Sequence, residues 1–172
     1  LQKMKRPYTA GFFTDTILDI HENLPSAAIG VDVLAGFPTE TDQQFENTYH
    51  LLQQLPVSYL HVFPFSPRQG TPAFYYTPKV DEAVIKERCR RLRELGRQKR
   101  AAFVAASLGK TLEGVVQHKQ ESHAGHLTAV TTNYLHVLIE KNNDIKGKIV
   151  DLVCEQCDSN LHIFGKLQAV SP

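Results

Sequence analysis

The side chains with the strongest chemistry of their own in this sequence are its cysteines. Cys154 and Cys157 have the Cys-x-x-Cys spacing that is found in redox and zinc sites. No second pair of cysteines accompanies them in the sequence, so a structural or incidental role is favoured and zinc binding is the alternative. The remaining cysteine, Cys89, stands alone within a helical pattern, and we expect it to pack in a core.

Histidines form a second candidate group. His118, His123 and His126 fall within one predicted loop, where their imidazoles could bind a metal ion. No carboxylate or thiolate stands at a convincing spacing from them, so we interpret them as exposed loop residues. His61 falls inside a predicted strand, and the sequence leaves open whether it lies in the core or faces a ligand.

A third candidate site is a turn between two predicted elements. Residues 29–41 read I-G-V-D-V-L-A-G-F-P-T-E-T, and they begin as an apolar run typical of a strand covered on both faces. The chain turns at Gly36 and Pro38, and Thr41 and Gln44 have the capping-box spacing that begins a helix. In α/β folds, ligands bind where a helix follows the carboxyl end of such a strand.

The same pattern recurs downstream. Residues 58–65 read S-Y-L-H-V-F-P-F, a second buried strand, and the polar loop S-P-R-Q-G-T-P-A follows at 66–73. Between the two strands, apolar residues recur at helical spacing, which predicts a βαβ unit with parallel strands. These helical residues are Phe45, Tyr49, Leu52 and Leu55.

Two further helices are expected on either side of this unit. The first begins at the predicted N-cap Thr9 and ends before Pro25. The second runs from Asp81 to about Ser107, with a basic outer face that is either solvated or in contact with phosphates. The expected apolar stripes are Phe13, Ile17, Ile20 and Leu24 in the first helix, and Val84, Ile85, Cys89, Leu92, Leu95 and Phe103 in the second. The basic residues are Lys86, Arg88, Arg90, Arg91, Arg93, Arg97, Lys99 and Arg100.

After Gly109 the apolar pattern changes from helical to alternating. Short strands separated by turn residues such as Asn133 favour a small closed or partly open β-barrel. The strands are expected at residues 111–117, 127–132, 134–140, 148–156 and 161–169.

The composition is that of an ordinary globular chain, with 172 residues, 42% hydrophobic residues, 22% charged residues and a net charge of +1. No apolar run is long enough to span a membrane, and no secretory signal opens the sequence. Three cysteines do not make a disulfide framework, so the cytoplasm is the expected location. Because the chain starts at Leu1 without an initiator Met, we expect a fragment; a start at Met4 is the alternative.

Taken together, these motifs resemble the tRNA methylthiotransferases, radical S-adenosylmethionine enzymes that end in a TRAM domain. The motifs are M-K-R-P-Y-T, D-V-L-A-G-F-P-T-E-T and S-P-R-Q-G-T-P-A, followed by the basic helix and the barrel. The wording H-V-F-P-F-S-P-R is most similar to the branch that modifies threonylcarbamoyladenosine next to the anticodon. The resemblance implies an α/β part followed by an all-β part. Residues 1–107 would be the C-terminal part of a partial TIM-like radical S-adenosylmethionine barrel, and residues 108–172 a TRAM barrel similar to an oligonucleotide-binding fold.

The resemblance also implies a cofactor site. Asp32, Gly36 and Glu40 would help to hold S-adenosylmethionine after the fifth barrel strand. Ser66 and Arg68 would lie at the barrel mouth, where the donors of an arginine fit a carboxylate or a phosphate. The family commonly has Gly at the position of Thr39, so a positive φ there would strain this residue.

For the substrate, the resemblance implies tRNA. The candidate contacts are Arg90, Arg93, Arg97, Lys110 and Tyr134. Phe164, a second aromatic residue of the barrel, could also stack on a base, although barrel aromatics more often belong to the core.

The iron–sulfur clusters of the family have no ligands in this sequence, because the C-x-x-x-C-x-x-C motif is absent. The parent enzyme would use one cluster to cleave S-adenosylmethionine and another in sulfur delivery, whereas this chain alone is expected to be inactive. It would also lack the upstream barrel strands. The alternatives are the branch that modifies an aspartate of a ribosomal protein, and a non-enzymatic RNA-binding module.

Overall fold

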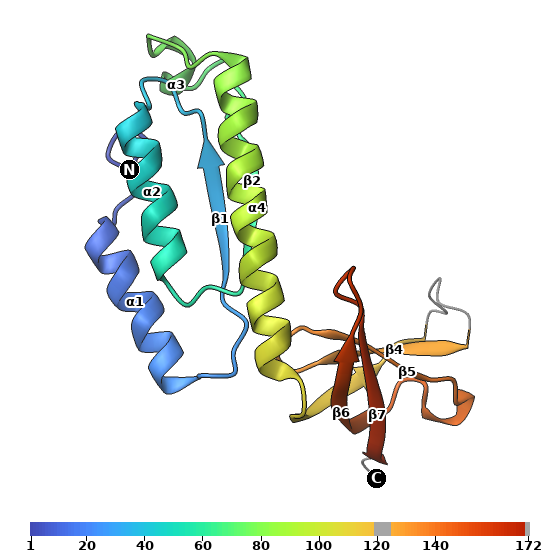
Figure 1. The fold of residues 1–172 in the computed structure, drawn as a ribbon. Coiled ribbons are helices and arrows are strands. Elements are labelled where there is room, and N and C mark those ends of the chain that lie inside the picture. Colours follow the sequence, from blue (N-terminus) through green and yellow to red (C-terminus); the bar gives the residue numbers. More distant parts are fainter. Residues whose placement is uncertain (119–124, 171–172) are drawn as a thin grey trace. The chain divides into compact units, whose positions relative to one another are not determined.

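The computed structural model describes residues 1–118 and 125–170, and the chain divides into two compact units, Leu1–Arg100 and Ala101–Pro172. The first unit combines helices with a small sheet, and the second is a β-barrel (Figure 1). The long helix α4 (Glu82–Ser107) begins in the first unit and ends in the second. In the described part of the chain, no helix is both long enough and apolar enough to cross a membrane.

The first unit contains the predicted βαβ arrangement. Strands β1 (Gly30–Ala35) and β2 (Tyr59–Pro64) pair in parallel, and α2 (Asp42–Gln54) connects them. The predicted capping box is confirmed, because the Thr41 side chain accepts from the Gln44 amide and the Gln44 side chain accepts from the Thr41 amide. A four-residue helix, α3 (Pro72–Tyr75), lies in the loop after β2.

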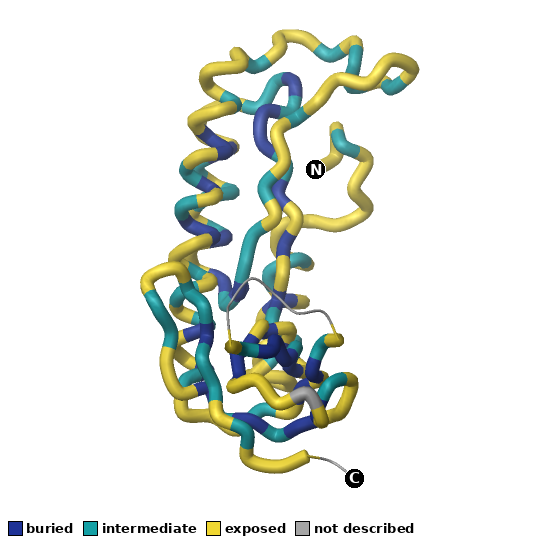
Figure 2. The backbone as a smooth tube through the Cα atoms, turned by 90° about the vertical axis from the view of Figure 1, so that its right-hand side faces the viewer, coloured by how far each residue is buried: buried dark blue, intermediate teal, exposed yellow. Residues whose placement is uncertain are grey.

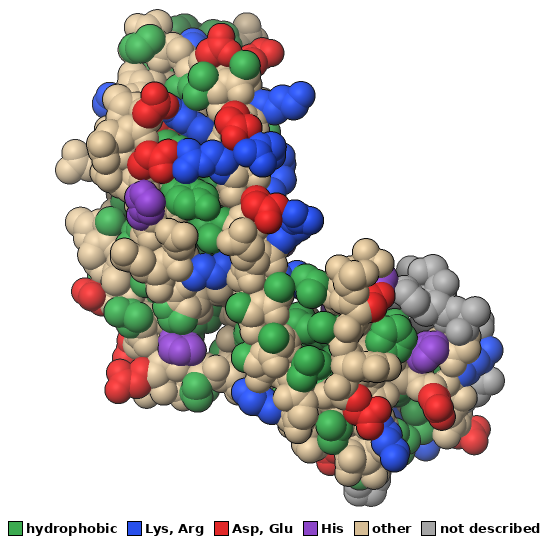
Figure 3. Space-filling model, viewed as in Figure 1, with side chains coloured by type: hydrophobic (Ala, Val, Ile, Leu, Met, Phe, Trp, Pro, Cys, Tyr) green, Lys and Arg blue, Asp and Glu red, His purple; other side chains and the backbone are tan. Residues whose placement is uncertain are grey.

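Helices pack their apolar stripes on this sheet. Helix α1 (Ala10–Asn23) begins at the predicted N-cap Thr9, and Ile17 is its buried residue. Two stripe predictions are wrong, since Leu24 and Val84 are exposed at the ends of their helices. On the outer surface of α2 and α4, acidic and basic side chains are interspersed (Figure 3). The core is formed by Ile17, Ile29, Val31, Val33, Ala35, Phe45, Leu52, Leu55, Val57, Cys89, Leu92 and Leu95.

The two strands are covered on one face only, so the prediction of strands buried on both faces is wrong. Burial alternates along β1, with Val31 and Val33 in the core and Asp32 exposed between them (Figure 2). No residue of β2 is fully buried, and half of the Phe63 surface is accessible. The reason is that the helices of the first unit bury only one face of the strand pair. No other element described in this unit buries the opposite face, which we call the open face.

The second unit is a closed barrel of five strands, as the alternating pattern predicted. Its strands are β3 (Thr111–Val116), β4 (His126–Thr131), β5 (His136–Glu140), β6 (Ile149–Cys157) and β7 (Ile163–Val170). They follow the order β3-β4-β5-β7-β6, and β6 closes the barrel onto β3. All pairs are antiparallel except β5 with β7. A short 3-10 helix, η1 (Asn143–Ile145), lies between β5 and β6.

The start of the third barrel strand differs from the prediction. The third barrel strand was expected to start at Tyr134, but β5 begins at His136 and Tyr134 lies in the preceding turn. Its φ is +60°, outside the region that a strand residue adopts. The barrel core includes Val104, Val116, Leu127, Ala129, Leu135, Val137, Ile139, Val150, Leu152, Cys154 and Ile163.

Candidate functional site

The loop after β1 is held in one shape by its glycine. Gly36 has a φ of +82°, and a Cβ atom placed on it would lie 2.4 Å from Cγ1 of Ile85 on α4. Any larger residue would therefore meet both backbone strain and a collision with the helix. Gly36 brings the loop against α4, at the carboxyl end of the strand.

Glu40 closes this loop through hydrogen bonds of its carboxylate. Its Oε2 accepts from the Gly36 amide at 2.8 Å and from Arg88 Nη1 at 2.7 Å. The other terminal nitrogen of Arg88 donates to Asp42 Oδ1 at 2.6 Å. The structure thus joins Gly36 and Glu40 directly and gives Glu40 an anchoring position within the loop.

Arg88 is a residue whose role the sequence analysis missed. It was assigned to the basic outer face, but that prediction is wrong, because Arg88 is only 4% exposed and its guanidinium lies 5.4 Å from the centre of the Phe45 ring. A signal was present in the sequence. Arg88 follows Ile85 by three residues and precedes Leu92 by four, so it belongs to the stripe of α4 that faces the sheet.

Thr39 lies in the same loop in a strained conformation. Its φ is +74°, so the strain expected for a residue other than Gly at this position is confirmed. The Thr39 amide donates to the carbonyl of Pro78 at 2.9 Å, and its hydroxyl accepts from Lys3 Nζ at 2.7 Å. These bonds tie the loop to two segments that are distant in sequence.

The loop after β2 lies beside the loop after β1. The amide of Phe65 donates to the carbonyl of Ala35 at 2.8 Å, and the rings of Phe37 and Phe65 meet edge to face at 5.4 Å. Ser66 and Arg68 follow on the exposed part of this second loop. Both candidate loops therefore occur at the carboxyl ends of adjacent parallel strands, as the βαβ pattern predicted.

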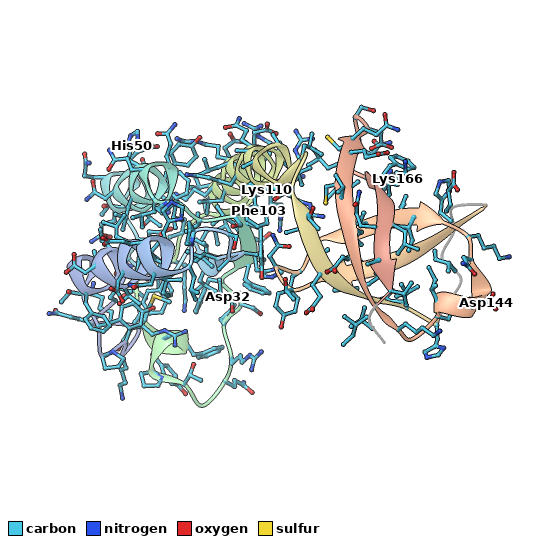
Figure 4. The ribbon with its side chains drawn as sticks, turned by 90° about the horizontal axis from the view of Figure 1, so that it is seen from below. Asp32, His50, Phe103, Lys110, Asp144 and Lys166 are labelled. Carbon is cyan, nitrogen blue, oxygen red and sulfur yellow. The ribbon has the colours of Figure 1, made fainter. Side chains whose placement is uncertain are left out.

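The open face of the sheet carries polar side chains next to these loops. Asp32 on β1 is opposite His61 on β2, and both are exposed. Figure 4 shows Asp32 on the side of the sheet away from α2 and α4. His61 packs edge to face on Tyr59 at 5.1 Å, and its exposure shows that it is not a core residue. A carboxylate and an imidazole in this position can accept hydrogen bonds from the amino or hydroxyl groups of a ligand.

The basic candidates on α4 are largely engaged in ion pairs. Arg90 and Arg97 pair with Glu87 and Glu94 one turn earlier, and Nη2 of Arg93 reaches the carbonyl of Val62 at 3.5 Å. The hydrogen bond from Arg90 holds the pKa of Glu87 below its usual value. Together with Lys86, these side chains line a shallow hollow on the helix surface. A phosphate group would have to compete with the two glutamates for the arginines.

Other basic residues of α4 serve the fold. Arg91 pairs with Glu46 on α2 and lies over the rings of Phe45 and Tyr49. Lys99 Nζ donates to the carbonyls of Gln53 and Leu55, each at 2.6 Å, and burial lowers the pKa of its ammonium group. The interpretation of the basic face as one continuous outer surface is therefore wrong for Arg88, Arg91 and Lys99.

Among the residues that the structure describes, the cysteines and histidines are not gathered into a site. Cys89 packs in the first core, as predicted, and burial raises the pKa of the Cys89 and Cys154 thiols. Within residues 1–118 and 125–170, no group of three or more His, Cys, Asp or Glu side chains could hold a metal ion. His118 is exposed, whereas His126 is half-buried at the start of β4 and packs on Phe164. His123 lies outside the described residues.

Two further candidates lie in the second unit. Lys110 is exposed just after the end of α4, and its carbonyl accepts from the Cys154 amide (Figure 4). Tyr134 is 74% exposed in the turn between β4 and β5. Phe164 is half-buried in β7.

Comparison with known proteins identifies relatives of this chain. It is 37% identical to the threonylcarbamoyladenosine tRNA methylthiotransferase of Aquifex aeolicus over 87% of its own length and 35% of the relative. The corresponding protein of Bacillus subtilis is 36% identical over 87% of this chain and 34% of the relative. A tRNA-2-methylthio-N(6)-dimethylallyladenosine synthase of Protochlamydia amoebophila is 33% identical over 86% of this chain and 33% of the relative. The chain thus spans about a third of the length of these relatives, and no protein-family model matches it.

Proposed function

Because the chain belongs to the same family as these tRNA methylthiotransferases, we propose that it is the C-terminal part of an enzyme that adds a methylthio group to threonylcarbamoyladenosine next to the anticodon of tRNA. The observation that carries this proposal is the identity of 36–37%, over 87% of the chain, to two relatives named for this modification. A relative named for the dimethylallyladenosine modification is less similar, at 33%.

In this proposal the first unit contributes part of the S-adenosylmethionine pocket. The open face fits one side of such a ligand, because Asp32 is exposed there and the Gly36 loop ends the same strand. Ser66 and Arg68 lie on the adjacent loop and would face the ligand from the second strand. Glu40 would act through the shape of the loop, since Gly36 and Arg88 engage its carboxylate. Bound S-adenosylmethionine would supply the methyl group and the radical chemistry.

The residues of this chain do not fit an iron–sulfur cluster. Its sequence contains three cysteines, and two of them, Cys89 and Cys154, are buried in different cores with raised thiol pKa values. Cluster iron is bound by thiolates, usually several from one site. Any cluster of the proposed enzyme would therefore need ligands from outside these 172 residues.

We further propose that the second unit is a TRAM barrel and that this chain contacts tRNA. The strand order and the parallel pairing of β5 with β7 support a likeness to the oligonucleotide-binding fold, whose barrels bind nucleic acids. Arg90, Arg93 and Arg97 on α4, with Lys110 beyond its end, would contact phosphates. We also propose the cytoplasm as the location of this enzyme.

Nucleoside analysis tests the function. The gene that encodes this chain would be disrupted in its own cell, and the tRNA digested and examined by mass spectrometry. We expect the methylthio group to disappear from threonylcarbamoyladenosine and to return with the intact gene. Loss from dimethylallyladenosine, or from an aspartate of a ribosomal protein, would assign another branch of the family. Unchanged methylthiolation of all three would contradict enzymatic function and leave the RNA-binding module.

A further inference from the structure

The turn between β4 and β5 is built to hold one aromatic residue away from the barrel. The Thr131 hydroxyl donates to Asn133 Oδ1 at 2.6 Å, and its oxygen accepts from the Leu135 amide at 3.0 Å. The amide of Tyr134 donates to the carbonyl of Thr131 at 2.9 Å. Thr131, Asn133 and Leu135 are all buried, while Tyr134 between them is 74% exposed. The turn is therefore rigid, and the Tyr134 ring projects from it into solvent.

Tyr134 occupies this turn in spite of its backbone. A φ of +60° suits Gly and, to a lesser degree, Asn, whereas a bulky side chain there is a backbone outlier. Such strain is found at functional sites, where the surrounding structure keeps it in place. Burial of the ring does not compensate for the strain here, because most of the ring surface remains accessible. The ring therefore contributes little to the stability of the barrel.

One row of barrel side chains that continues from this turn contains no Lys, Arg, Asp or Glu. A row of outward side chains crosses four strands, from Ile149 on β6 through Val115 and Val130 to His136 on β5. Val115 is 47% exposed and Ile149 is 45% exposed, and His136 stands two residues after Tyr134. Such a row suits contact with flat, weakly polar groups rather than with phosphates.

The charge of the second unit also disfavours contact with phosphates. Residues 101–172 contain six lysines and no arginine, against seven aspartates and glutamates. Phosphate contacts need a local excess of positive charge, which this unit does not have. Base stacking needs only an exposed aromatic face, and tyrosine is one of the residues on which unpaired RNA bases stack.

We propose that Tyr134 is a stacking site for an unpaired RNA base, and that the strands and turns of the barrel bind RNA mainly through this contact, while phosphate contacts come from α4 and from Lys110 at its end. The inference rests on the proposed function, which supplies tRNA as the partner. It adds a division of labour, in which the arginines of α4 contact phosphates and Tyr134 contacts a base. The strain in the turn is retained because a glycine there would offer no ring.

Substitution of Tyr134 by glycine separates the effect of the ring on RNA binding from the effect of the backbone strain on stability. Tyr134→Gly removes the ring and also removes the strain, so the turn should keep its shape and the barrel should melt at the same or a higher temperature. Binding of the full chain to a fluorescently labelled anticodon stem-loop RNA should weaken about 10-fold, since stacking of one base on an aromatic residue contributes on the order of 1–3 kcal/mol. The slope of log affinity against log salt should not change, because every phosphate that the wild type binds is still bound.

Three controls make this result specific. Tyr134→Phe keeps the ring and should recover the affinity. Leu161→Gly relieves a comparable positive φ, +62°, in the β6–β7 turn and should leave RNA binding unaltered. A fully paired RNA duplex of the same length offers no unpaired base, so the Tyr134→Gly variant should bind it as the wild type does.

The outcomes distinguish this inference from the proposed function. If the wild type binds the stem-loop and Tyr134→Gly binds it equally well, the stacking site is wrong and the tRNA function stands. If Tyr134→Gly weakens the stem-loop and the duplex alike, a base-specific contact is also excluded. If the wild type binds neither RNA, both the stacking site and the proposed contact of this chain with tRNA are overturned.

Discussion

Arg88 Nη1 lies 2.7 Å from Glu40 Oε2, and the two side chains are only 5% and 15% exposed. This ion pair joins α4 to the loop that follows β1, because the same carboxylate oxygen also accepts from the Gly36 amide. A buried charge whose partner is removed keeps its desolvation cost and loses its compensation. The pair therefore ties the conformation of the loop to the packing of the long helix.

The first prediction concerns this pair. Arg88→Ala should lower the free energy of unfolding of the first unit by about 3 kcal/mol, the scale of a broken buried pair. Urea titration followed by far-ultraviolet circular dichroism, which reports mainly on the helices, measures the loss. Arg90→Ala is the matched control, because Arg90 pairs with Glu87 on the exposed face of the same helix and should change little. Equal effects of the two substitutions would contradict a structural role for Arg88.

The second prediction concerns Thr39 in the same loop. Thr39→Gly should raise the stability of the first unit by about 1 kcal/mol, because glycine adopts a φ of +74° without the strain of a β-branched residue. Thr39→Ala is the control: it removes the hydroxyl that accepts from Lys3 but keeps the Cβ atom, so it should give no such gain. Urea midpoints of the three proteins provide the comparison. A gain with Ala as large as that with Gly would assign the effect to the hydroxyl instead.

The loop after β1 and its contact with α4 show what could be predicted from the sequence and what could not. The capping box at Thr41 and Gln44 depends on local spacing, and it was predicted correctly. Arg88 occupies a position of the apolar stripe, but its charge led to assignment on the outer face; only tertiary partners such as Glu40 make its burial favourable. The open face has a similar cause, since apolar strand residues do not reveal how many layers cover them.

The candidate site, like the fold, could be predicted from the sequence only in part. The loops at the carboxyl ends of both strands were predicted from the βαβ pattern, because parallel strands end at one edge of a sheet. The turn at Asn133 was predicted, but Tyr134 was assigned to the strand that follows, because tyrosine at a positive φ contradicts its ordinary preference and no neighbouring glycine marks the position.

A third prediction uses the β6–β7 turn, where Nδ1 of His162 lies 2.8 Å from Asp158 Oδ2. The hydrogen bond from the His162 side chain, with amide hydrogen bonds from His162 and Asn160, lowers the pKa of Asp158. A carboxyl group whose pKa is lower in the folded state stabilises that state above its unfolded pKa of about 4, and the contribution disappears as the pH falls through the folded value. The barrel should therefore lose stability below about pH 4.

Asp158→Asn tests this dependence. The variant should unfold at a lower urea concentration than the wild type at pH 6, and the difference should shrink as the pH falls toward 3. Glu155→Gln, an exposed substitution in the preceding strand β6, controls for the general effect of removing a carboxylate. A difference between Asp158→Asn and the wild type that does not vary with pH would show that the charge of Asp158 is not involved.

The last prediction concerns the arginines of α4. If Arg90, Arg93 and Arg97 contact phosphates, their joint replacement by Ala should weaken tRNA binding and flatten its salt dependence, by roughly one unit of log–log slope for each phosphate that is no longer bound. The loss of affinity should be similar for different tRNA sequences, because phosphate groups carry no base identity. Fluorescence anisotropy at several salt concentrations measures both quantities.

The ion pairs on this helix supply a second, opposite test. Arg90 and Arg97 are paired with Glu87 and Glu94, so these glutamates compete with any phosphate for the guanidinium groups. Replacing both glutamates by Gln frees the arginines and should strengthen tRNA binding while steepening the salt dependence. The alanine and glutamine variants should thus move affinity and slope in opposite directions. If both sets leave affinity and slope unchanged, the arginines do not contact phosphates, and the face is a solvated surface.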